Sequence, residues 1–595
     1  MIEKSIAVLP FLNISAEPDN EYFSDGITEE IINALTKIAG LNVTARTSSF
    51  VFKNKNLDIR SIGNKLGVAT ILEGSVRKAK NRVRITAQLV KTDGGFHLWS
   101  KKFDRELEDI FELQDEISLL IADQIRENFG HLVMSDQLVS SPEISIKAYE
   151  LYLRGKHYTH KFSKNEILKG IEILEKVIQL QPDFALAYAN IHYAYNMLAA
   201  AGLLPAENAL KKGIIYLNKA IELDKDLPEC HHSLGWHSLN KNWDFISAVK
   251  HLNKALELRP GYADAHQKMF ITLALEGKKE DSYAHISKAL KLDPLSVLNN
   301  YFYGYYFYLN ENYDEANLHF KKCFEIGPKF LFSYPMYGLS LIAQGQAEFL
   351  LEEEKRIVSD KKTIESFLLK ALAYSALKDT SNTEKYLKQL QIKLKGEERD
   401  HARFFLIHIY NILEQYDNAL ALIDEGVLNK EPLMTLLKED PLLKSLHRFE
   451  RFQKAMQKIY ALSSSAIQKK KPLEPESLIG SEYAEYKINL EKLLKEKHIY
   501  LDATLSLRSL SKQLGVHPNK LSWFLNEHFN KNFNEYINTF RIEAFKNKAL
   551  DSANENITLL GLAYDSGFNS KTVFNTFFKK SVGLSPREWL KSAKK

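Results

Sequence analysis

The chain has 595 residues, of which 45% are hydrophobic and 26% are charged. This composition is ordinary for a folded globular protein and excludes fibrous and wholly disordered classes. At roughly 100 to 200 residues per domain, the length predicts several domains. The net charge of +5 is uneven, because residues 501–595 hold 14 Lys and Arg against 8 Asp and Glu, a net charge of +6 that leaves −1 for the rest. We therefore expect a basic surface near the C-terminus, and nucleic acid is one partner that such a surface attracts.

The two cysteines, Cys230 and Cys323, fall on helical patterns without the spacing of a metal site. Neither a disulfide framework nor zinc is expected to organise the fold, and we predict no metal or cofactor. The first residues lack a basic stretch followed by a long apolar run, and polar residues interrupt the most apolar window, residues 186–204. These features predict a cytoplasmic chain without a membrane span.

Residues 1–130 alternate between strand-like and helix-like patterns. A β-rich run at 5–11 precedes a segment at 21–39 whose apolar residues have helical spacing. Three strand patterns follow at 68–78, 81–91 and 96–105, and the middle one alternates strictly between apolar and polar residues. A helix over about 109–128 is expected to close a small α/β domain.

Residues 145–460 show a wholly helical pattern that repeats itself. Equivalent small residues recur on the second helix of successive units, at Gly170, Gly213, Ala248, Ser282 and Ala316, and the last two steps are 34 residues each. This period resembles that of tetratricopeptide repeats. A single helix pair cannot bury its apolar face, so such units stack into a superhelix with a concave surface. We expect an all-α superhelix that receives a protein or peptide partner in its groove.

The segment 463–480 is polar, contains proline and lacks periodicity, so it is predicted to be a linker. Beyond it, residues 481–595 contain two helix-turn-helix patterns. In the first, a helix over 505–514 meets Gly515, and Pro518 opens a second helix. The second pattern covers 557–580 with its turn at Gly567, and residues 533–552 are long enough for one connecting helix.

Residues 481–592 resemble the DNA-binding domain of AraC-family regulators. The most specific part of the resemblance consists of Gly567, Phe568, Ser570, Phe574, Phe578, Lys579, Gly583, Ser585 and Pro586. The resemblance implies bacterial transcription control, an all-α domain, and two recognition helices that enter successive major-groove segments on one face of double-stranded DNA. A rigid connecting helix would set their separation near one DNA turn, about 34 Å.

Polar residues on the two recognition helices are the candidate DNA contacts, while Leu521, Phe524 and Leu525 on the first and Val573, Phe574 and Phe577 on the second are expected to pack inward. The candidate base contacts are Asn519, Lys520, Ser522, Trp523, Asn526, Lys571, Thr572, Asn575 and Thr576. Asn can pair with adenine and Lys can reach guanine acceptors. The candidate phosphate contacts, which position the protein without reading sequence, are Arg541, Lys546, Lys579 and Lys580.

The N-terminal segments, among them SIAVLPF, ILEGSVRK and HLWSKKFDR, resemble the TolB-like domain that precedes tetratricopeptide repeats in bacterial signalling proteins, some of which carry nucleotide cyclases. Its polar residues Asp25, Glu29, His97, Asp104 and Arg105 are expected to cap helices and to pair on strand edges rather than to line a ligand site. We predict no catalysis.

Three classes of function remain in competition. The leading one is a transcription regulator whose N-terminal and repeat domains receive a signal or partner. The alternative is a tetratricopeptide signalling scaffold without specific DNA binding. A nucleotide cyclase is disfavoured, because repeats and linker over 130–480 leave no room for a catalytic domain. The sequence leaves open a small-molecule effector and a homodimer.

Overall fold

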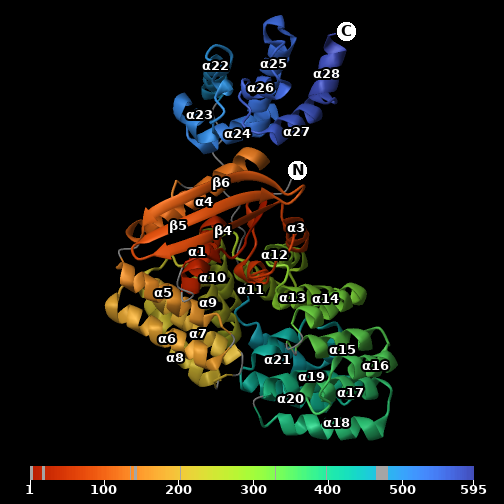
Figure 1. Cartoon of the computed structure of the whole chain (residues 1–595). Helices are drawn as coiled ribbons and strands as arrows, with labels where there is room; N and C mark the ends of the chain where they lie inside the picture. The colour runs from red at the N-terminus through yellow and green to blue at the C-terminus, as the bar shows by residue number, and fades with distance from the viewer. Residues whose placement is uncertain are drawn as a thin grey trace.

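The computed structural model describes residues 4–15, 20–134, 136–139, 144–161, 163–200, 203–204, 206–327, 330, 332–396, 398–463 and 480–594. Figure 1 shows an N-terminal sheet domain, a long array of repeat helices below it and a group of C-terminal helices above it. The predicted fold class is confirmed: a small α/β domain, an all-α tetratricopeptide superhelix and an all-α double helix-turn-helix domain. Residues 464–479 of the predicted linker lie outside the described residues.

The N-terminal domain is built on one sheet. Its strands are β1 (Ser5–Val8), β2 (Leu12–Asn13), β3 (Asn42–Val43), β4 (Thr70–Ala79), β5 (Arg82–Lys91) and β6 (Phe96–Glu106). Their order is β3-β1-β4-β5-β6, with β2 beside β4; β1 runs parallel to both neighbours, whereas β4, β5 and β6 are antiparallel. The predicted alternation on β5 is confirmed, because Val83, Ile85, Ala87 and Leu89 are fully buried between more exposed neighbours.

Helices cover both faces of this sheet. They are α1 (Glu21–Thr36), α2 (Arg46–Phe50), α3 (Ile59–Leu66) and α4 (Ile110–Phe129), the last preceded by η2 (Leu107–Asp109). Apolar residues of α1 and α4 pack with Ile6, Val8 and Leu72 on one face, while α3 packs with Ala7 and Ile71 on the other. The C-terminal end of α4 emerges from this core toward the C-terminal helices (Figure 1).

The repeat region consists of antiparallel helix pairs. Its helices are α5 (Ile146–Thr159), α6 (Lys164–Leu180), α7 (Ala185–Ala200), α8 (Ala206–Leu223), α9 (Pro228–His237), α10 (Phe245–Leu258), α11 (Ala263–Leu275), α12 (Lys279–Leu292), α13 (Val297–Leu309), α14 (Tyr313–Ile326), α15 (Ser333–Ala343), α16 (Ala347–Ile357), α17 (Ile364–Ala376), α18 (Thr380–Lys393), α19 (Arg399–Ile412) and α20 (Tyr416–Leu428), with η3 (Ser238–Asn242) after α9. The small residues stand where paired helices cross: a Cβ on Gly170 of α6 would lie 2.9 Å from the carbonyl oxygen of Gly155 in α5. Any larger side chain there would push the pair apart.

The end of the repeat region folds back onto earlier repeats. It comprises η4 (Pro432–Leu436), η5 (Pro441–Arg448) and α21 (Glu450–Ile459). The Tyr308 hydroxyl of α13 donates to Asp440 Oδ1 over 2.9 Å, and His408 Nε2 of α19 lies 3.0 Å from Asp440 Oδ2. All three groups are buried, so this hydrogen-bonded set ties the last segment to two distant repeats.

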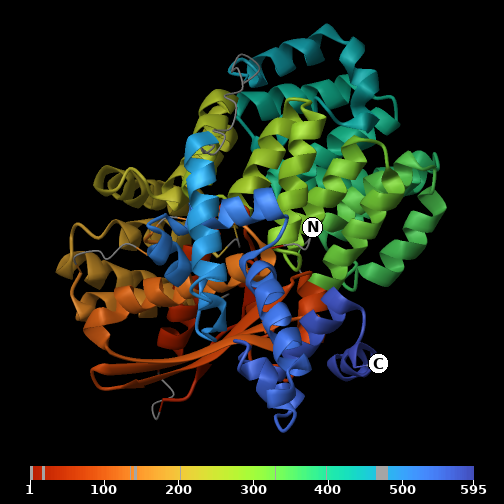
Figure 2. The same ribbon diagram turned by 90° about the horizontal axis from the view of Figure 1, so that it is seen from above.

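The C-terminal region has two small cores joined by one helix. Its elements are α22 (Gly480–Lys495), η7 (Ile499–Leu501), α23 (Leu507–Leu514), α24 (Pro518–Phe529), α25 (Phe533–Leu550), η8 (Ser552–Asn554), α26 (Leu559–Tyr564), α27 (Lys571–Val582) and α28 (Pro586–Ala593). Phe533 and Ile537 of α25 belong to the core with α22–α24, whereas Ile542 and Phe545 belong to the core with α26–α28. As predicted, a single helix therefore links two units, which Figure 2 shows from above.

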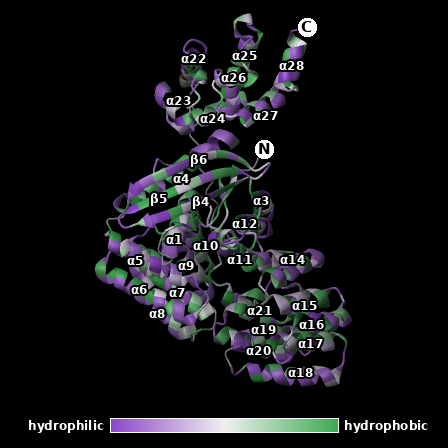
Figure 3. Cartoon of the chain, viewed as in Figure 1, coloured by the Kyte–Doolittle hydropathy of each residue, from purple (hydrophilic) through white to green (hydrophobic). Residues whose placement is uncertain are grey.

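Hydropathy alternates around the helices of all three regions, as expected where each helix buries one side (Figure 3). Within the residues that the structure describes, no helix is both long and apolar enough to span a bilayer.

Candidate nucleic-acid interface

Each unit of the C-terminal region has the local geometry of a helix-turn-helix. Ser506 caps α23 by accepting from the Ser509 amide over 3.1 Å, and Gly515 ends that helix with φ of +68°. In the second unit Thr558 caps α26, and Gly567 turns with φ of +94°. A Cβ on Gly567 would lie 2.3 Å from the Tyr500 carbonyl oxygen, so only glycine fits at that turn.

The second recognition helix, α27, presents an exposed polar row. Its predicted base contacts Lys571, Thr572, Asn575 and Thr576 are all exposed, while Phe574 and Phe578 are buried in the core. One prediction about this helix is wrong. Val573 was expected to pack, but its side chain is 43% exposed, because the two inward phenylalanines four residues apart define the buried side and Val573 lies off it.

The first recognition helix, α24, buries the residues predicted to face the core, Leu521, Phe524 and Leu525. Of the five predicted base contacts, only Lys520 is exposed; Asn519, Trp523 and Asn526 are half-buried. Ser522 is only 3% exposed, which contradicts its predicted outward position. The sequence pattern predicted that the polar side of this helix is open to the DNA groove, whereas part of that side lies against the N-terminal domain.

The end of α4 and the segment after it cover part of the outward side of α24. Asn519 Oδ1 accepts from Arg126 Nη1 over 2.8 Å, and Asn519 Nδ2 donates to the Met134 carbonyl oxygen over 2.9 Å. Gly130 passes so near to Asn526 that a Cβ on it would lie 2.8 Å from Asn526 Oδ1. Both hydrogen-bonding ends of the Asn519 amide are therefore engaged within the chain.

The same end of α4 binds α23. Glu127 Oε1 accepts from the Leu507 amide over 2.8 Å, and Arg508 Nε donates to Asp123 Oδ2 over 2.9 Å. Burial raises the pKa of Glu127 to about 7, since the nearby charge of Asp123 adds to the effect while the Leu507 hydrogen bond opposes it. Sequence reasoning missed Arg508, although its place in the first turn of a capped helix is a usual position for binding an anion.

Two further contacts extend this interface to the start of α25. Asn532 Nδ2 donates to the Asn128 carbonyl oxygen over 2.9 Å, and Asn534 Nδ2 donates to Asn128 Oδ1 over 3.1 Å. These contacts of the end of α4 with α23 and α25 are thus all hydrogen bonds or ion pairs.

One predicted phosphate contact, Arg541, is contradicted by its position. Its side chain in α25 is 7% exposed, Nε donates to the Tyr500 carbonyl oxygen and Nη2 donates to the Asp502 carbonyl oxygen, each over 2.8 Å. Burial lowers the pKa of Arg541 to about 10. Arg541 lies on the same side of α25 as the buried Ile537 and Phe545, each four residues away, and it fastens the η7 loop to this helix instead of reaching solvent.

The other three predicted phosphate contacts reach the surface or lie partly exposed. Lys579 and Lys580 are exposed, and Lys580 pairs with Glu535 over 2.6 Å. Lys546 is half-buried and pairs with Glu543 over 2.8 Å.

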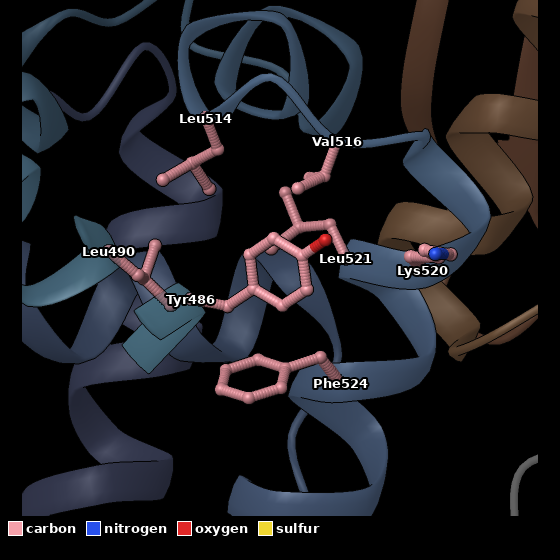
Figure 4. Close-up of a pocket in the computed structure, with 7 residues that line it drawn as sticks. All are labelled: Tyr486, Leu490, Leu514, Val516, Lys520, Leu521 and Phe524. Atoms are coloured by element: carbon pink, nitrogen blue, oxygen red, sulfur yellow. The ribbon is translucent and has the colours of Figure 1, made fainter. Parts of the chain in front are cut away.

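An apolar hollow lies where α22 meets the first helix-turn-helix. It measures about 260 Å³, much of it open to solvent. In Figure 4 the Tyr486 ring lies among the residues that line the hollow, and Lys520 stands at its rim. The lining residues are Tyr486, Leu490, Leu514, Val516, Lys520, Leu521 and Phe524. The hollow thus lies between α22 and the recognition helix α24.

The polar residues noted in the N-terminal domain mostly make ion pairs. Asp25 binds Lys53 over 2.6 Å, and Glu29 binds Lys156 of α5 over 3.2 Å, which links α1 to the first repeat. Although burial opposes it, the surrounding cations Lys156, His160 and Arg46 lower the pKa of Glu29 to about 2. On the strands, Asp104 pairs with Arg82 and Arg84, and Arg105 pairs with Glu116, which agrees with the expected structural roles.

Comparisons with known families define the two ends of the chain. Residues 510–592 match a family described as a helix-turn-helix domain, and residues 2–120 match the second domain of HilA/YgeH-like transcriptional regulators. The C-terminal region is thus a helix-turn-helix domain of AraC type, and the N-terminal domain is of a kind found in HilA-like regulators. The resemblance of the latter to TolB-like domains stays a prediction.

Individual relatives match only parts of the chain. It is 23% identical to the transcriptional regulator HilA of Salmonella typhimurium over 49% of this chain and 51% of that protein. It is 37% identical to a Rhizobium meliloti protein named "Putative adenylate cyclase 3" over 39% of each. The chain therefore spans about half, or less, of the length of these curated relatives. A solved tetratricopeptide repeat protein of Parabacteroides merdae is 13% identical over 45% of this chain and 98% of that chain, with a TM-score of 0.32.

Proposed function

We propose that this protein is a sequence-specific, DNA-binding transcription regulator. The observation that carries the proposal is the pair of helix-turn-helix units joined by α25, with the exposed polar row of α27 on the second. Both recognition helices lie along the same edge of the C-terminal domain in Figure 1. Two helices of this kind on one rigid connector are suited to successive major-groove segments of one DNA duplex.

The proposed base contacts are the outward polar residues that the structure leaves on the two helices. They are Asn519, Lys520, Trp523, Asn526, Lys571, Thr572, Asn575 and Thr576. Ser522 is omitted because it is buried, and Arg541 is omitted from the phosphate contacts for the same reason. Lys546, Lys579 and Lys580 remain as proposed phosphate contacts; Lys546 and Lys580 would exchange carboxylate partners for phosphate.

The test is selection of bound fragments from genomic DNA by the full-length protein, followed by affinity measurements at several salt concentrations. A shared sequence should emerge. Lys571→Ala should relax base preference at one position, with a loss of about 1–3 kcal/mol. Lys579→Gln should weaken all sequences alike and reduce the salt slope by about 1. Lys591→Ala on α28 removes an equally exposed lysine outside the proposed contacts and serves as the matched control.

The second candidate is a tetratricopeptide scaffold without specific DNA binding. It is favoured by one observation, namely that the N-terminal domain covers part of α24. A protein that retains no genomic fragment even at low salt, in any variant, would establish the scaffold and refute the regulator.

We also propose that the protein is not an enzyme, although its Rhizobium meliloti relative is named as an adenylate cyclase. The matched domain families are those of a helix-turn-helix domain and of a transcriptional regulator, and repeat helices account for most of the described residues between them. Incubation with ATP and divalent cations should yield no cyclic AMP, and sustained production of cyclic AMP would overturn this part of the proposal.

We propose that the repeats receive a protein or peptide partner. We also propose that the protein acts in the cytoplasm and does not bind a membrane. We further propose that the protein responds to a small-molecule effector and forms a homodimer, which the sequence leaves open. Sedimentation of the protein with and without its selected DNA decides between one and two chains per site.

A further inference from the structure

The end of α4 places carboxylates where the first helix-turn-helix could hold DNA phosphates. Asp123 and Glu127 lie one helical turn apart and meet Arg508 and the Leu507 amide at the start of α23. The first amides of a helix have no partner within the helix and carry partial positive charge, so they bind anions. An arginine beside them binds a carboxylate or a phosphate by the same charge-assisted hydrogen bonds.

The same segment also satisfies a group suited to base recognition. The Asn519 amide accepts from Arg126 and donates to the Met134 carbonyl oxygen. Asn recognises adenine by the same combination of one donated and one accepted hydrogen bond. Thus residues 123–134 provide α23 with a carboxylate at Asp123 and an acceptor oxygen at Glu127, and α24 with a complementary donor and acceptor, which are the kinds of contact that DNA phosphates and bases provide.

The interface can open at modest cost because it has no apolar core. Among the described residues, the two C-terminal hydrophobic clusters contain only residues of the C-terminal region, and the N-terminal cluster contains none of them. The polar contacts between the regions are those named above together with the pair of His517 Nε2 and Asp136 Oδ1 at 3.2 Å. Polar interfaces of this kind resemble transient contacts between domains rather than permanent ones.

We propose that residues 123–134 act as an internal mimic of DNA, which docks on α23 and α24 and must be displaced before both helix-turn-helix units can bind one site. Arg508 and the Leu507 amide are then a phosphate-binding site of the open form. This inference rests on the proposed function. In the docked form α27 keeps its exposed row, so that form can hold DNA by its second unit alone.

The docked population sets the apparent affinity, because the dissociation constant is divided by the fraction of molecules that are open. Variants on α4 can change this fraction without altering any residue of the DNA-binding region. Asp123→Ala combined with Asn128→Ala removes the partner of Arg508 and one partner of α25. Glu127→Ala is the second release variant, because it removes the carboxyl that accepts from the Leu507 amide.

The experiment measures full-length protein in two ways. Release variants should bind the selected DNA on the order of ten-fold more tightly or better, with the same base preference. Amide hydrogen exchange over 505–514 should be faster in them than in the wild type, and DNA should produce the same acceleration over 123–130 in the wild type. Adding Arg508→Ala to a release variant should lower the salt slope by about 1. Glu112→Ala, at the exposed start of the same helix, is the matched control and should change none of these.

The inference is overturned if the release variants gain no affinity while their exchange confirms that α4 has separated. It is also overturned if exchange over 505–514 in the wild type already matches that of both release variants. Failure of the proposed function looks different: no variant retains any genomic fragment, and this inference falls with it.

Discussion

The sharpest prediction concerns Arg541, for which sequence and structure imply opposite phenotypes. If the side chain bound phosphate, its loss would weaken DNA binding and leave folding intact. In the structure it is buried, and it donates two hydrogen bonds of 2.8 Å to carbonyl oxygens of the η7 loop. Hydrogen bonds from a charged group contribute about 1.5–3 kcal/mol each. The two contributions do not simply add, because both hydrogen bonds come from one side chain and relaxation of the η7 loop offsets part of the loss. We therefore expect Arg541→Gln to destabilise the α25 region by about 3 kcal/mol.

Amide hydrogen exchange in the full chain measures this effect locally. A loss of about 3 kcal/mol corresponds to exchange on the order of 100-fold faster over 533–550, because each 1.4 kcal/mol is a factor of ten. The repeat helices should be unaffected. Lys579→Gln, which removes an exposed cation of the same domain, should stay within about 0.5 kcal/mol of the wild type. Unchanged exchange in Arg541→Gln together with weakened DNA binding would refute the structural role and restore the phosphate contact.

Two further predictions concern the repeats. Burial lowers the pKa of His192 to about 4, and the neutral ring donates from Nδ1 to the Gly213 carbonyl oxygen over 3.0 Å and accepts from Asn196 at Nε2. Because the folded-state pKa lies below the unfolded value near 6.5, the stabilisation from the neutral ring is complete above pH 6.5 and is lost as the pH falls toward 4, by about 3 kcal/mol in all. The free energy of unfolding in urea should therefore depend less on pH in His192→Gln than in the wild type. An identical pH dependence would contradict the role given to His192. Gly170→Leu should lower the free energy of unfolding by about 1–3 kcal/mol, since backbone atoms of α5 lie within 3 Å of its Cβ position. Gly396→Ala should not lower it, because no atom lies nearer than 3.8 Å to that Cβ position. Equal stability of the two variants would count against the packing argument.

Local patterns were sufficient for the elements and for most of the inward-facing residues. The alternation of β5, the turn at Gly515 and the inward position of Phe574 all follow from short-range rules of spacing and backbone geometry. Those rules assign one side of each helix to the core. They cannot tell whether the opposite side meets water or another domain.

Some errors arise where that second question decides the outcome. Ser522 lies on the helix that α4 covers. Arg541 is an error of a different kind, because its spacing of four residues from Ile537 and Phe545 places it on the buried side of α25, under the η7 loop. The contact between Arg126 and Asn519 joins residues 393 positions apart in the chain. Periodicity within a window of a dozen residues carries no information about such a pair, so the α4 interface, including the contact of Arg508 with Asp123, could not be predicted from the sequence.

The distribution of apolar contacts indicates where a signal must act. One hydrophobic cluster contains the N-terminal sheet, α1 and α4 together with Tyr149, Tyr152 and Leu198 of the first repeats, and the pair of Glu29 with Lys156 lies beside it. Moving the N-terminal domain against those repeats would expose this shared core, whereas separating α4 from α23 and α24 breaks polar contacts that DNA can replace. A partner on the repeats can therefore favour the open form only by binding it more tightly than the docked form. Linkage then requires DNA to strengthen the binding of that partner by the same factor, and the release variants, which are already open, should lose this mutual dependence.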